Sequence, residues 1–375
     1  MPEPRVAIWR SAMLGGSETF VRNQGDALGR WRPVYVGATK VDSAVSRDSD
    51  LIAYPSPADR NAFLRLRLTG GSPRLRRLLD EVSPALVHAH FGGDGWLVSG
   101  EAKRLRLPLI VTVHGHDVTR QPAGTGAHGV RYRRNLRTVF GRAALVLAVS
   151  EVIRSKAIGW GADPAKVRVH YTGVRIPPAP DPVAKQWDVV FIGRFVEKKG
   201  VDDLLAALAG LAPARPRAVF IGAGPLLPGM RAYARELGVD ATFLGMQPPD
   251  EVRRVLLASR LLAAPSRTAR DGDTEGLPTT VMEAAALGLP VVSTQHSGIP
   301  EAVVDGETGL LSAEGDRVGL AANLSRLLGD ESLRDRLGQQ ARALMTARFD
   351  LMKQTARLED IYDEVLAGAQ RSTGR

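Results

Sequence analysis

Residues 189–200 read VVFIGRFVEKKG, an apolar and β-branched run that ends in a glycine turn rich in cations. A short apolar run bounded by a turn is typical of a strand buried on both faces of a parallel sheet. The turn contains Arg194 and Lys199, and a helix is expected to open at about Asp202. The segment therefore predicts a strand–turn–helix unit of an α/β sheet, with both side chains placed where the strand ends.

The same alternation of apolar runs and helical patterns continues in both directions. The expected strands are VAIW (6–9), ALVHAHF (85–91), LIVTVHG (109–115), LVLAVS (145–150), VVFIGR (189–194), AVFIGAG (218–224), ATFLG (241–245), LLAAPS (261–266) and PVVST (290–294). Strands that alternate with helices indicate parallel βαβ units. A segment with four prolines, IPPAPDPVAKQW (176–187), interrupts the series and disfavours helix and central strand alike, so it predicts a domain linker.

Length and composition favour two domains, because 375 residues with 44% hydrophobic content are too many for one ordinary core. We expect Rossmann-like domains over 1–178 and 179–350. A final helical part, 351–375, is expected to pack across both. Its apolar stripe consists of Leu351, Leu358, Ile361, Tyr362 and Val365, within a helical stretch of roughly 316–370.

Composition excludes several classes of protein. The chain has no cysteine, so disulfides, thiolate metal sites and a cysteine nucleophile are excluded, and a reducing compartment is the simplest interpretation. No apolar run has the length of a signal peptide's core near the start or the roughly 20 residues of a membrane span, so we expect a cytoplasmic protein. Residues 1–180 carry 27 Lys and Arg against 14 Asp and Glu, whereas residues 181–375 carry 23 against 26. A basic first half favours an anionic partner, with an ordinary solvated surface as the alternative.

Arg194 and Lys199 are candidates for binding a diphosphate. Charge-assisted bonds from an arginine and a point charge from a lysine stabilise a leaving diphosphate when no divalent metal does so. A solvated turn with incidental charges is the alternative.

A second candidate site lies in PSRTARDGDTEGLPTTVMEAAALGLPVVST (265–294). Glu275 precedes a Gly-Leu-Pro turn, Thr279 and Thr280 open a helix, and Glu283 lies about one turn inside it. A helix N-terminus offers N–H groups to a phosphate, and the carboxylates can accept hydrogen bonds from sugar hydroxyls. A helix cap and a surface glutamate are the alternative. However, Glu283 lies in an apolar stretch, where an unpartnered carboxylate would be costly to desolvate and a bound ribose would supply the partner.

The order and spacing of these motifs closely resemble the retaining glycosyltransferases of family four, which adopt the GT-B fold of two Rossmann-like domains facing a cleft. Glu275 and Glu283 lie eight residues apart, and GRFVEKKG lies about 80 residues upstream. Other matching segments are GGSETF (15–20), HAHF (88–91), TVHGHD (112–117), VSE (149–151), TGV (172–174), IGAGP (221–225) and SGIPEAVVDGETGLL (297–311). The resemblance therefore covers nearly the whole chain, and it leans toward bacterial exopolysaccharide enzymes of the colanic-acid type.

The resemblance implies roles for the matching residues. Arg194 and Lys199 would bind the donor diphosphate, Glu283 the ribose hydroxyls, and Glu275 would lie beside the transferred sugar. His114, after the strand LIVTV, would contact the donor sugar as a neutral imidazole. The other donor-binding residues implied are Gly15, Gly16, Gly193, Gly222, Gly224, Met246, Gly276, Leu277, Pro278 and Thr279. No metal or further cofactor is implied.

The resemblance gives less definite roles to the other histidines, and the sequence departs from the family pattern at two places. His116 and Asp117 would hold His114 or the acceptor, whereas His88 and His90 are expected to point to opposite faces of their strand, in core or supporting roles. TGV replaces the more familiar Asn-Gly-Val, which leaves the interdomain contact open. The charged loop SRTARDGDTEG (266–276) is longer than in many members and is a candidate for acceptor contact.

The N-terminal half contains two concentrated cationic stretches, in one of which RLRRLLDEV (74–82) is predicted to be an amphipathic helix. Their residues are Arg74, Arg76, Arg77, Arg131, Arg133, Arg134 and Arg137. In lipid-acting members of the family such faces rest on the membrane. Peripheral contact with the inner face of the cell membrane is therefore a candidate, and a solvated helix is the alternative.

Together these features predict a retaining, metal-independent hexosyltransferase that uses a nucleotide diphosphate sugar, with a UDP-sugar favoured over GDP-mannose. The expected acceptor is a lipid-linked saccharide or oligosaccharide, and a small natural product or polyol is the alternative. Rival functions are an inverting enzyme of the same fold, a nucleotide-sugar epimerase, and a catalytically silent binding or scaffold protein. A nucleic-acid binder would not require the donor residues. A dinucleotide dehydrogenase is disfavoured because VAIWRSAMLGGSE lacks the G-x-G-x-x-G turn.

Overall fold

The structure is a computed structural model that describes residues 3–179, 181 and 183–373. Two residues of the expected linker, Pro180 and Pro182, and the end of the expected last part, 374–375, lie outside the described residues. The chain divides into two compact units, Met1–Gly173 with Leu351–Arg375, and Val174–Asp350. The chain therefore returns to the first unit after completing the second.

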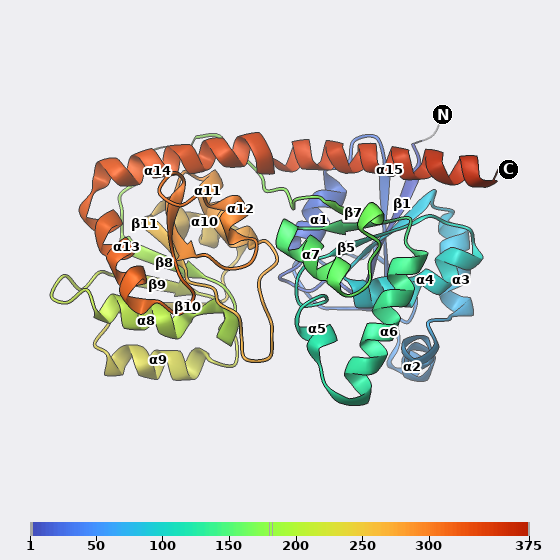
Figure 1. Cartoon of the computed structure of the whole chain (residues 1–375), viewed down its shortest axis with the longest axis horizontal. Coiled ribbons are helices and arrows are strands. Elements are labelled where there is room, and N and C mark those ends of the chain that lie inside the picture. Colours follow the sequence, from blue (N-terminus) through green and yellow to red (C-terminus); the bar gives the residue numbers. More distant parts are fainter. Residues whose placement is uncertain (1–2, 180, 182, 374–375) are drawn as a thin grey trace. The chain divides into compact units, whose positions relative to one another are not determined.

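The first unit contains a parallel sheet with the strand order β3-β2-β1-β4-β5-β6-β7. Figure 1 labels β1, β5 and β7 of this sheet. Its described strands are β1 (Arg5–Met13), β2 (Arg32–Lys40), β3 (Leu51–Ile52), β4 (Leu86–His90), β5 (Leu109–Val113), β6 (Leu145–Ala148) and β7 (Val167–Val169). Its helices are α1 (Thr19–Asp26), α2 (Arg60–Thr69), α3 (Pro73–Val82), α4 (Gly92–Arg104), α5 (Arg120–Ala123), α6 (Gly126–Arg142), α7 (Glu151–Gly159) and α15 (Leu351–Thr373).

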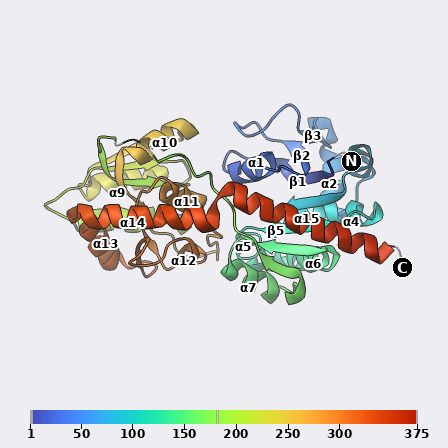
Figure 2. The ribbon, with the colours of Figure 1, turned by 90° about the horizontal axis from the view of Figure 1, so that it is seen from above.

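The last helix, α15, covers part of the first sheet. Leu358 and Tyr362 are fully buried against Val6, Ile8 and Ile110 of the sheet, and Ile361 and Val365 pack around them. Figure 2 shows α15 lying over the strands of this unit. The apolar stripe expected from the sequence is therefore one buried face of a helix, and its burial holds the helix to the sheet.

The second unit contains a parallel sheet with the strand order β10-β9-β8-β11-β12-β13. Its described strands are β8 (Trp187–Ile192), β9 (Ala218–Ile221), β10 (Ala241–Gly245), β11 (Ser259–Ala264), β12 (Val291–Thr294) and β13 (Gly309–Ser312). Its helices are α8 (Val201–Ala209), α9 (Leu227–Glu236), α10 (Pro249–Leu257), α11 (Thr279–Ala286), α12 (Ile299–Ala302), α13 (Arg317–Gly329) and α14 (Glu331–Leu344).

Both faces of the second sheet are buried, as the opening segment predicts. Val189 and Phe191 point into one core, with side chains of α8 and α13, and Val190 points into the other, with side chains of α10 and α11. Alternate residues of one apolar run thus serve two cores. This explains why the run is continuously apolar rather than alternating with polar residues.

Each of the nine expected strands overlaps a strand of the structure, but β2, β3, β7 and β13 were not predicted. β2 reads RPVYVGATK and begins and ends with polar residues, so it lacks the continuous apolar signal. The expected helical stretch 316–370 is divided into α13, α14, a π-helix (Met345–Phe349) and α15. One division falls at Asp330, whose side chain accepts a hydrogen bond from the Leu333 N–H and caps α14.

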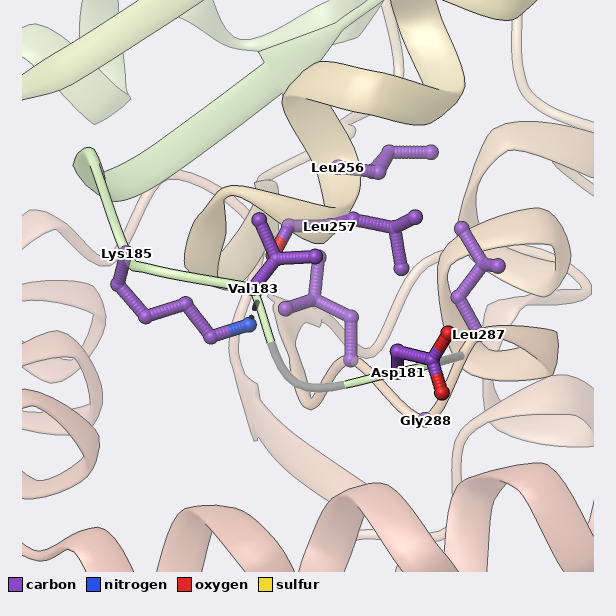
Figure 3. A pocket seen from close by; sticks show the side chains of 8 residues that line it. Asp181, Val183, Lys185, Leu256, Leu257, Leu287 and Gly288 are labelled. Atoms are coloured by element: carbon purple, nitrogen blue, oxygen red, sulfur yellow. Dashed lines mark hydrogen bonds between the residues drawn. The ribbon is translucent and has the colours of Figure 1, made fainter. Parts of the chain in front are cut away.

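A cavity of about 240 Å³ lies in the second unit (Figure 3). It is lined by Asp181, Val183, Lys185, Leu256, Leu257, Leu287, Gly288 and Leu289. Lys185 precedes β8, Leu257 precedes β11 and Leu289 precedes β12. The cavity therefore lies at the amino ends of the strands, away from the carboxyl ends at which ligands of α/β sheets bind.

Candidate functional site

Lys199 and Glu275 meet at the carboxyl end of the second sheet. β8 leads through Gly193 and Arg194 into the 3₁₀ helix Glu197–Lys199, and Glu275 lies in the loop after β11. The Lys199 Nζ lies 3.0 Å from the Glu275 Oε1. A Cβ atom at Gly193 would lie 3.4 Å from the Lys199 Cε, so the glycine lets the lysine side chain lie close to the main chain.

Glu275 is buried and ionised. Burial by itself would raise the pKa of this carboxyl, but Lys199 and Lys198 outweigh it and hold the pKa at about 2. Its Oε1 is paired with Lys199, and among the described residues no other group donates a hydrogen bond to that oxygen. A buried carboxylate with unused acceptor capacity is suited to receiving a hydroxyl group.

Glu283 differs from Glu275 because no cation compensates its burial. It lies in α11, and burial raises its pKa to about 7. Among the described residues, no hydrogen bond or ion pair engages its carboxyl group. The sequence predicted an unpartnered carboxyl in an apolar stretch at this position, and the structure confirms that placement.

The remaining predicted donor residues of this unit surround the same edge. Arg194 is exposed directly after β8, and Met246, directly after β10, is 69% exposed. Gly276, Leu277 and Pro278 are buried and lead into α11, which opens at Thr279 as expected. No described contact joins Arg194 to Lys199 or Glu275, so of these three residues the structure brings together only Lys199 and Glu275.

Gly222 and Gly224 let the loop after β9 pack against the loop after β8. Their φ angles are 135° and 153°, in the region that favours glycine. A Cβ atom at Gly222 would lie 1.9 Å from the Gly193 carbonyl oxygen, and one at Gly224 would lie 2.6 Å from the Phe195 carbonyl oxygen. No side chain fits at either position without moving the turn that carries Lys199.

In the first unit, His114 follows β5 and is bonded to His90. The His90 Nδ1 lies 3.0 Å from the His114 Nε2, and the rings of Phe20 and Phe91 pack against His114. Burial lowers the pKa of His114 well below its usual value, and Arg10 lowers it further. The imidazole is therefore neutral at physiological pH, as expected from the sequence.

The expectation that His88 and His90 point to opposite faces is wrong. Residues two apart on a strand share a face, and the two rings lie 4.5 Å apart. His88 is buried between the hydroxyls of Tyr362 and Thr112, at 2.6 and 2.7 Å. Its role in the core is confirmed, whereas His90 directly supports His114.

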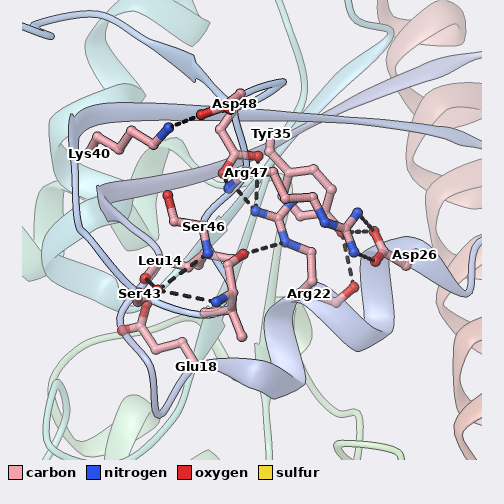
Figure 4. Close-up of polar contacts among 12 residues, drawn as sticks. Leu14, Glu18, Arg22, Asp26, Tyr35, Lys40, Ser43, Ser46, Arg47 and Asp48 are labelled. Atoms are coloured by element: carbon pink, nitrogen blue, oxygen red, sulfur yellow. Dashed lines mark hydrogen bonds and ion pairs between the residues drawn. The ribbon is translucent and has the colours of Figure 1, made fainter.

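The loop with Gly15 and Gly16 is held by charged groups that the sequence analysis did not single out. The Gly15 N–H donates to Glu18, which pairs with Arg10, and Arg10 also pairs with Asp94. Ser43 donates its hydroxyl to the Leu14 carbonyl at 2.6 Å. Figure 4 shows Ser43 next to Leu14 and, beyond it, the network around Arg22. Asp94 and Ser43 are distant from this loop in the sequence, so no local pattern marks them, whereas Glu18 lies within the segment GGSETF.

Two family models together match most of the chain: "Glycosyltransferase Family 4" over residues 14–176 and "Glycosyl transferases group 1" over residues 175–344. A D-inositol 3-phosphate glycosyltransferase of Corynebacterium efficiens is 30% identical over 310 residues, which are 74% of this chain and 71% of that protein. The chain belongs to glycosyltransferase family 4. The amylovoran biosynthesis glycosyltransferase AmsK of Erwinia amylovora is 32% identical over 253 residues, which are 65% of this chain and 61% of AmsK.

The solved structure of HepE from Anabaena in complex with UDP has a TM-score of 0.77 to this family 4 chain. The identity is 19%, and the match covers 96% of this chain and 100% of HepE. It confirms the GT-B fold, with a Rossmann-like domain in each unit. The chain spans about 60% of the length of the exopolysaccharide relatives it matches first, AmsK and the colanic acid protein WcaL.

Asp117 and His116 have different surroundings in this family 4 chain. Asp117 is buried, and its carboxylate accepts main-chain N–H groups of Gly92, His114 and Gly115 at 2.8 to 3.0 Å. It therefore fixes the backbone around His114, as one of the two expected alternatives stated. His116 is exposed and its ring packs against Phe91.

The structure also locates contacts around Glu275 that the sequence analysis missed. Lys198 is buried, and its Nζ lies 3.1 Å from the Asp273 carboxylate and donates to the Thr274 carbonyl at 3.0 Å. His296 and Ser297 contact the main chain of Glu275. The two consecutive lysines of EKKG are visible in the sequence. Nothing in the sequence distinguishes Lys198, which is buried, from Lys199, which lies at the site.

Among residues 3–179, 181 and 183–373, no group of three or more His, Asp or Glu side chains is placed to hold a metal ion. None of the helices in the same ranges is both long and apolar enough to cross a membrane. Metal independence stays a prediction, to be tested by chelation.

Proposed function

We propose that this protein is a retaining glycosyltransferase that moves a hexose-type sugar from a nucleotide diphosphate sugar, without a divalent metal, to a hydroxyl of a lipid-linked saccharide or oligosaccharide. The observation that carries the proposal is the contact of Lys199 with Glu275 at the carboxyl end of the sheet. It places a cation beside an ionised carboxylate that can accept hydrogen bonds from hydroxyl groups. Such a pair suits the junction of a diphosphate and a sugar.

In the proposed reaction, the acceptor oxygen forms a bond to the anomeric carbon on the face from which the diphosphate leaves. The bond between that carbon and the phosphate oxygen breaks, and the leaving oxygen takes the proton of the acceptor hydroxyl. Arg194 and Lys199 stabilise the charge that develops on the diphosphate. Glu275 and His114 hydrogen-bond sugar hydroxyls, and Glu283 accepts hydrogen bonds from the ribose. Glu275 forms no covalent intermediate in this scheme.

A UDP-sugar is the favoured donor, because HepE, which shares the fold, was solved with UDP and with UDP-glucose. The saccharide acceptor is supported by the similarity to AmsK and WcaL, named for amylovoran and colanic acid biosynthesis. A phosphorylated polyol is a second candidate acceptor, because the inositol phosphate enzyme of C. efficiens matches a larger share of the chain. A silent scaffold protein would not require the paired and desolvated charges.

The test begins with a thermal-shift screen of nucleotide diphosphates and their sugars, since a ligand that binds the folded state raises the unfolding temperature. The best donor is then supplied with saccharide and polyol acceptors, with and without a chelator. We expect transfer that survives chelation and a product whose NMR coupling shows retention. Loss of transfer on chelation contradicts metal independence, an inverted anomer contradicts retention, and absence of any transfer contradicts the function.

Peripheral membrane contact is a further proposal, made for the first unit. α2 has exposed Leu64 and Leu68, which are 47% and 54% exposed, and carries three arginines and no acidic residue. Arg131 of α6 donates a hydrogen bond to the Arg67 carbonyl, so the two helices adjoin. Of the predicted cationic residues, Arg76 and Arg77 are exposed, Arg74 pairs with Asp59, and Arg133 is used internally by the carbonyls of Pro122 and Gly124.

A further inference from the structure

The main chain of Glu275 is held on both sides by two consecutive residues of a loop that follows β12. The Glu275 N–H donates to the His296 Nε2 at 3.0 Å, and the Glu275 carbonyl accepts from the Ser297 hydroxyl at 2.5 Å. His296 is 1% exposed, and Ser297 has a φ of 49°. A left-handed conformation is uncommon outside glycine, so the loop keeps a strained residue where it contacts Glu275.

The contact fixes which nitrogen of His296 carries the proton. A main-chain N–H can only donate, so the Nε2 must accept and the proton of the neutral ring must lie on Nδ1. The Nδ1 lies 2.6 Å from the Glu314 Oε1. Burial alone would raise the pKa of Glu314, but the Thr268 N–H and His296 lower it below its usual value, so the carboxylate is ionised and accepts from Nδ1.

Glu314 also holds the other end of the same loop. Its Oε2 accepts the Thr268 N–H at 2.7 Å. The charged loop from Thr268 to Glu275 is therefore closed by one chain of contacts, from the Thr268 N–H through Glu314 and His296 to the Glu275 N–H. Lys198 fastens the part between them through Asp273 and the Thr274 carbonyl. The Glu275 end of the loop thus depends on the tautomer of His296, whereas Glu314 holds the Thr268 end directly.

We propose that His296, held by Glu314 in its Nδ1–H tautomer, is a positioning residue that fixes Glu275 for sugar transfer. This inference rests on the proposed function, because the role of Glu275 in turnover is part of that proposed function. In this arrangement the charged loop from Thr268 to Glu275 is held at both ends and supports Glu275, rather than being a mobile insertion. His296 touches no substrate and acts only through the peptide group of Glu275.

Two substitutions separate this role from simple filling of the core. In His296→Gln the side-chain amide oxygen can take the place of Nε2 and keep the acceptor for the Glu275 N–H. In His296→Asn the shorter amide can take the place of Nδ1 and keep the donor to Glu314, but it leaves the Glu275 N–H unpaired. Each variant thus keeps one of the two bonds, and each is the other's control.

We expect His296→Asn to lower kcat about 10- to 100-fold, as a displacement of about 1 Å in a reacting group does. His296→Gln should retain kcat within about threefold. The Kd for the free nucleotide diphosphate should change little in both, because Lys199 remains. Equal losses of kcat in the two variants, following equal losses of thermal stability, would falsify the proposal and leave His296 a core residue.

Nitrogen NMR of ¹⁵N-histidine-labelled protein reads the tautomer without any turnover. The His296 signals, assigned by their loss in His296→Gln, should show a protonated Nδ1 and a bare Nε2 at neutral pH. A proton on Nε2 overturns the inference whatever the activity. If the tautomer is as stated but the wild-type protein transfers no sugar, the proposed function fails instead, so the two failures are distinguishable.

Discussion

At the scale of single residues, the site consists of two carboxyl groups in opposite electrostatic surroundings. Glu275 is buried beside two lysines, which hold its pKa at about 2, whereas burial without a cation raises the pKa of Glu283 to about 7. The sequence predicted both positions. It could not predict the difference, because the two compensating lysines lie 76 and 77 residues before Glu275 in the chain and only the fold brings them close to it.

Lys199→Ala should lower kcat by about 100-fold or more, because it removes one fixed cation from a departing diphosphate. Folding should be retained, since Lys198 still lies 4.0 Å from the Glu275 Oε1 and partly compensates its burial. Steady-state kinetics with the identified donor measure the effect, and Lys156→Ala, at an exposed position of α7, is the matched control. Near-normal turnover in Lys199→Ala would remove the lysine from the mechanism.

Glu283→Gln should stabilise the protein at pH 8 and leave it nearly unchanged at pH 4. The folded-state pKa, about 7, lies above the ordinary 4.5, so between these values the folded protein binds more protons than the unfolded one. Stability therefore falls as pH rises through this window, by at most about 3 kcal/mol, and the amide abolishes the loss. Chemical unfolding of both proteins across pH 4–8 checks this. Parallel curves for the two would mean that the carboxyl has a compensating partner.

At the scale of elements, the glycines of the loops after β8 and β9 determine how closely the two loops pack. Gly222→Ala should lower the free energy of unfolding by about 1–3 kcal/mol, because the new Cβ would lie 1.9 Å from the Gly193 carbonyl oxygen and φ is 135°. It should also weaken nucleotide binding by displacing the turn with Arg194 and Lys199. Denaturant unfolding and calorimetric titration measure the two effects.

Gly229→Ala is the control for this prediction. Gly229 lies in α9, and a Cβ there would meet nothing within 4 Å. Alanine is favoured over glycine inside a helix by about 1 kcal/mol, so this variant should be as stable as the wild type or more stable. If both alanine variants behave alike, the close packing of the loops does not constrain the site.

Elements also show what a single sequence can and cannot reveal. Strands buried on both faces, such as β8 and β12, were predicted because each contains a short apolar run, VVFI in β8 and VV in β12. The short β3 and β7 pair within the first sheet without such a run, so only the fold identifies them. The same distinction applies to the site. Glu275, Lys199 and Glu283 lie in motifs that are visible in the sequence. His90, His296 and Glu314 act through contacts with residues of loops that follow other strands, and only the fold reveals those contacts.

At the scale of the whole molecule, charge and exposed apolar side chains coincide in the first unit. The cationic excess of the chain lies in residues 1–180, and α2 adds two exposed leucines to that charge. An amphipathic helix with basic residues binds at an anionic lipid interface by burying its apolar face and neutralising headgroups. The second half carries a slight acidic excess, so substitutions of its arginines provide a control on the same molecule.

The wild-type protein should therefore bind vesicles that contain phosphatidylglycerol and not vesicles of phosphatidylcholine alone, with binding that weakens as salt is raised. Arg65→Gln with Arg67→Gln removes two cations of α2 whose side chains pair with no other described residue. Each contributes about 1 kcal/mol near an anionic surface, so partitioning should fall about 30-fold. Arg231→Gln with Arg253→Gln, at exposed positions of the second unit, should leave it unchanged. Co-sedimentation measures all three proteins. If a specific face docks on the membrane, binding depends on where the arginines are removed. Equal binding by the two double variants would therefore mean that net charge alone attracts the protein.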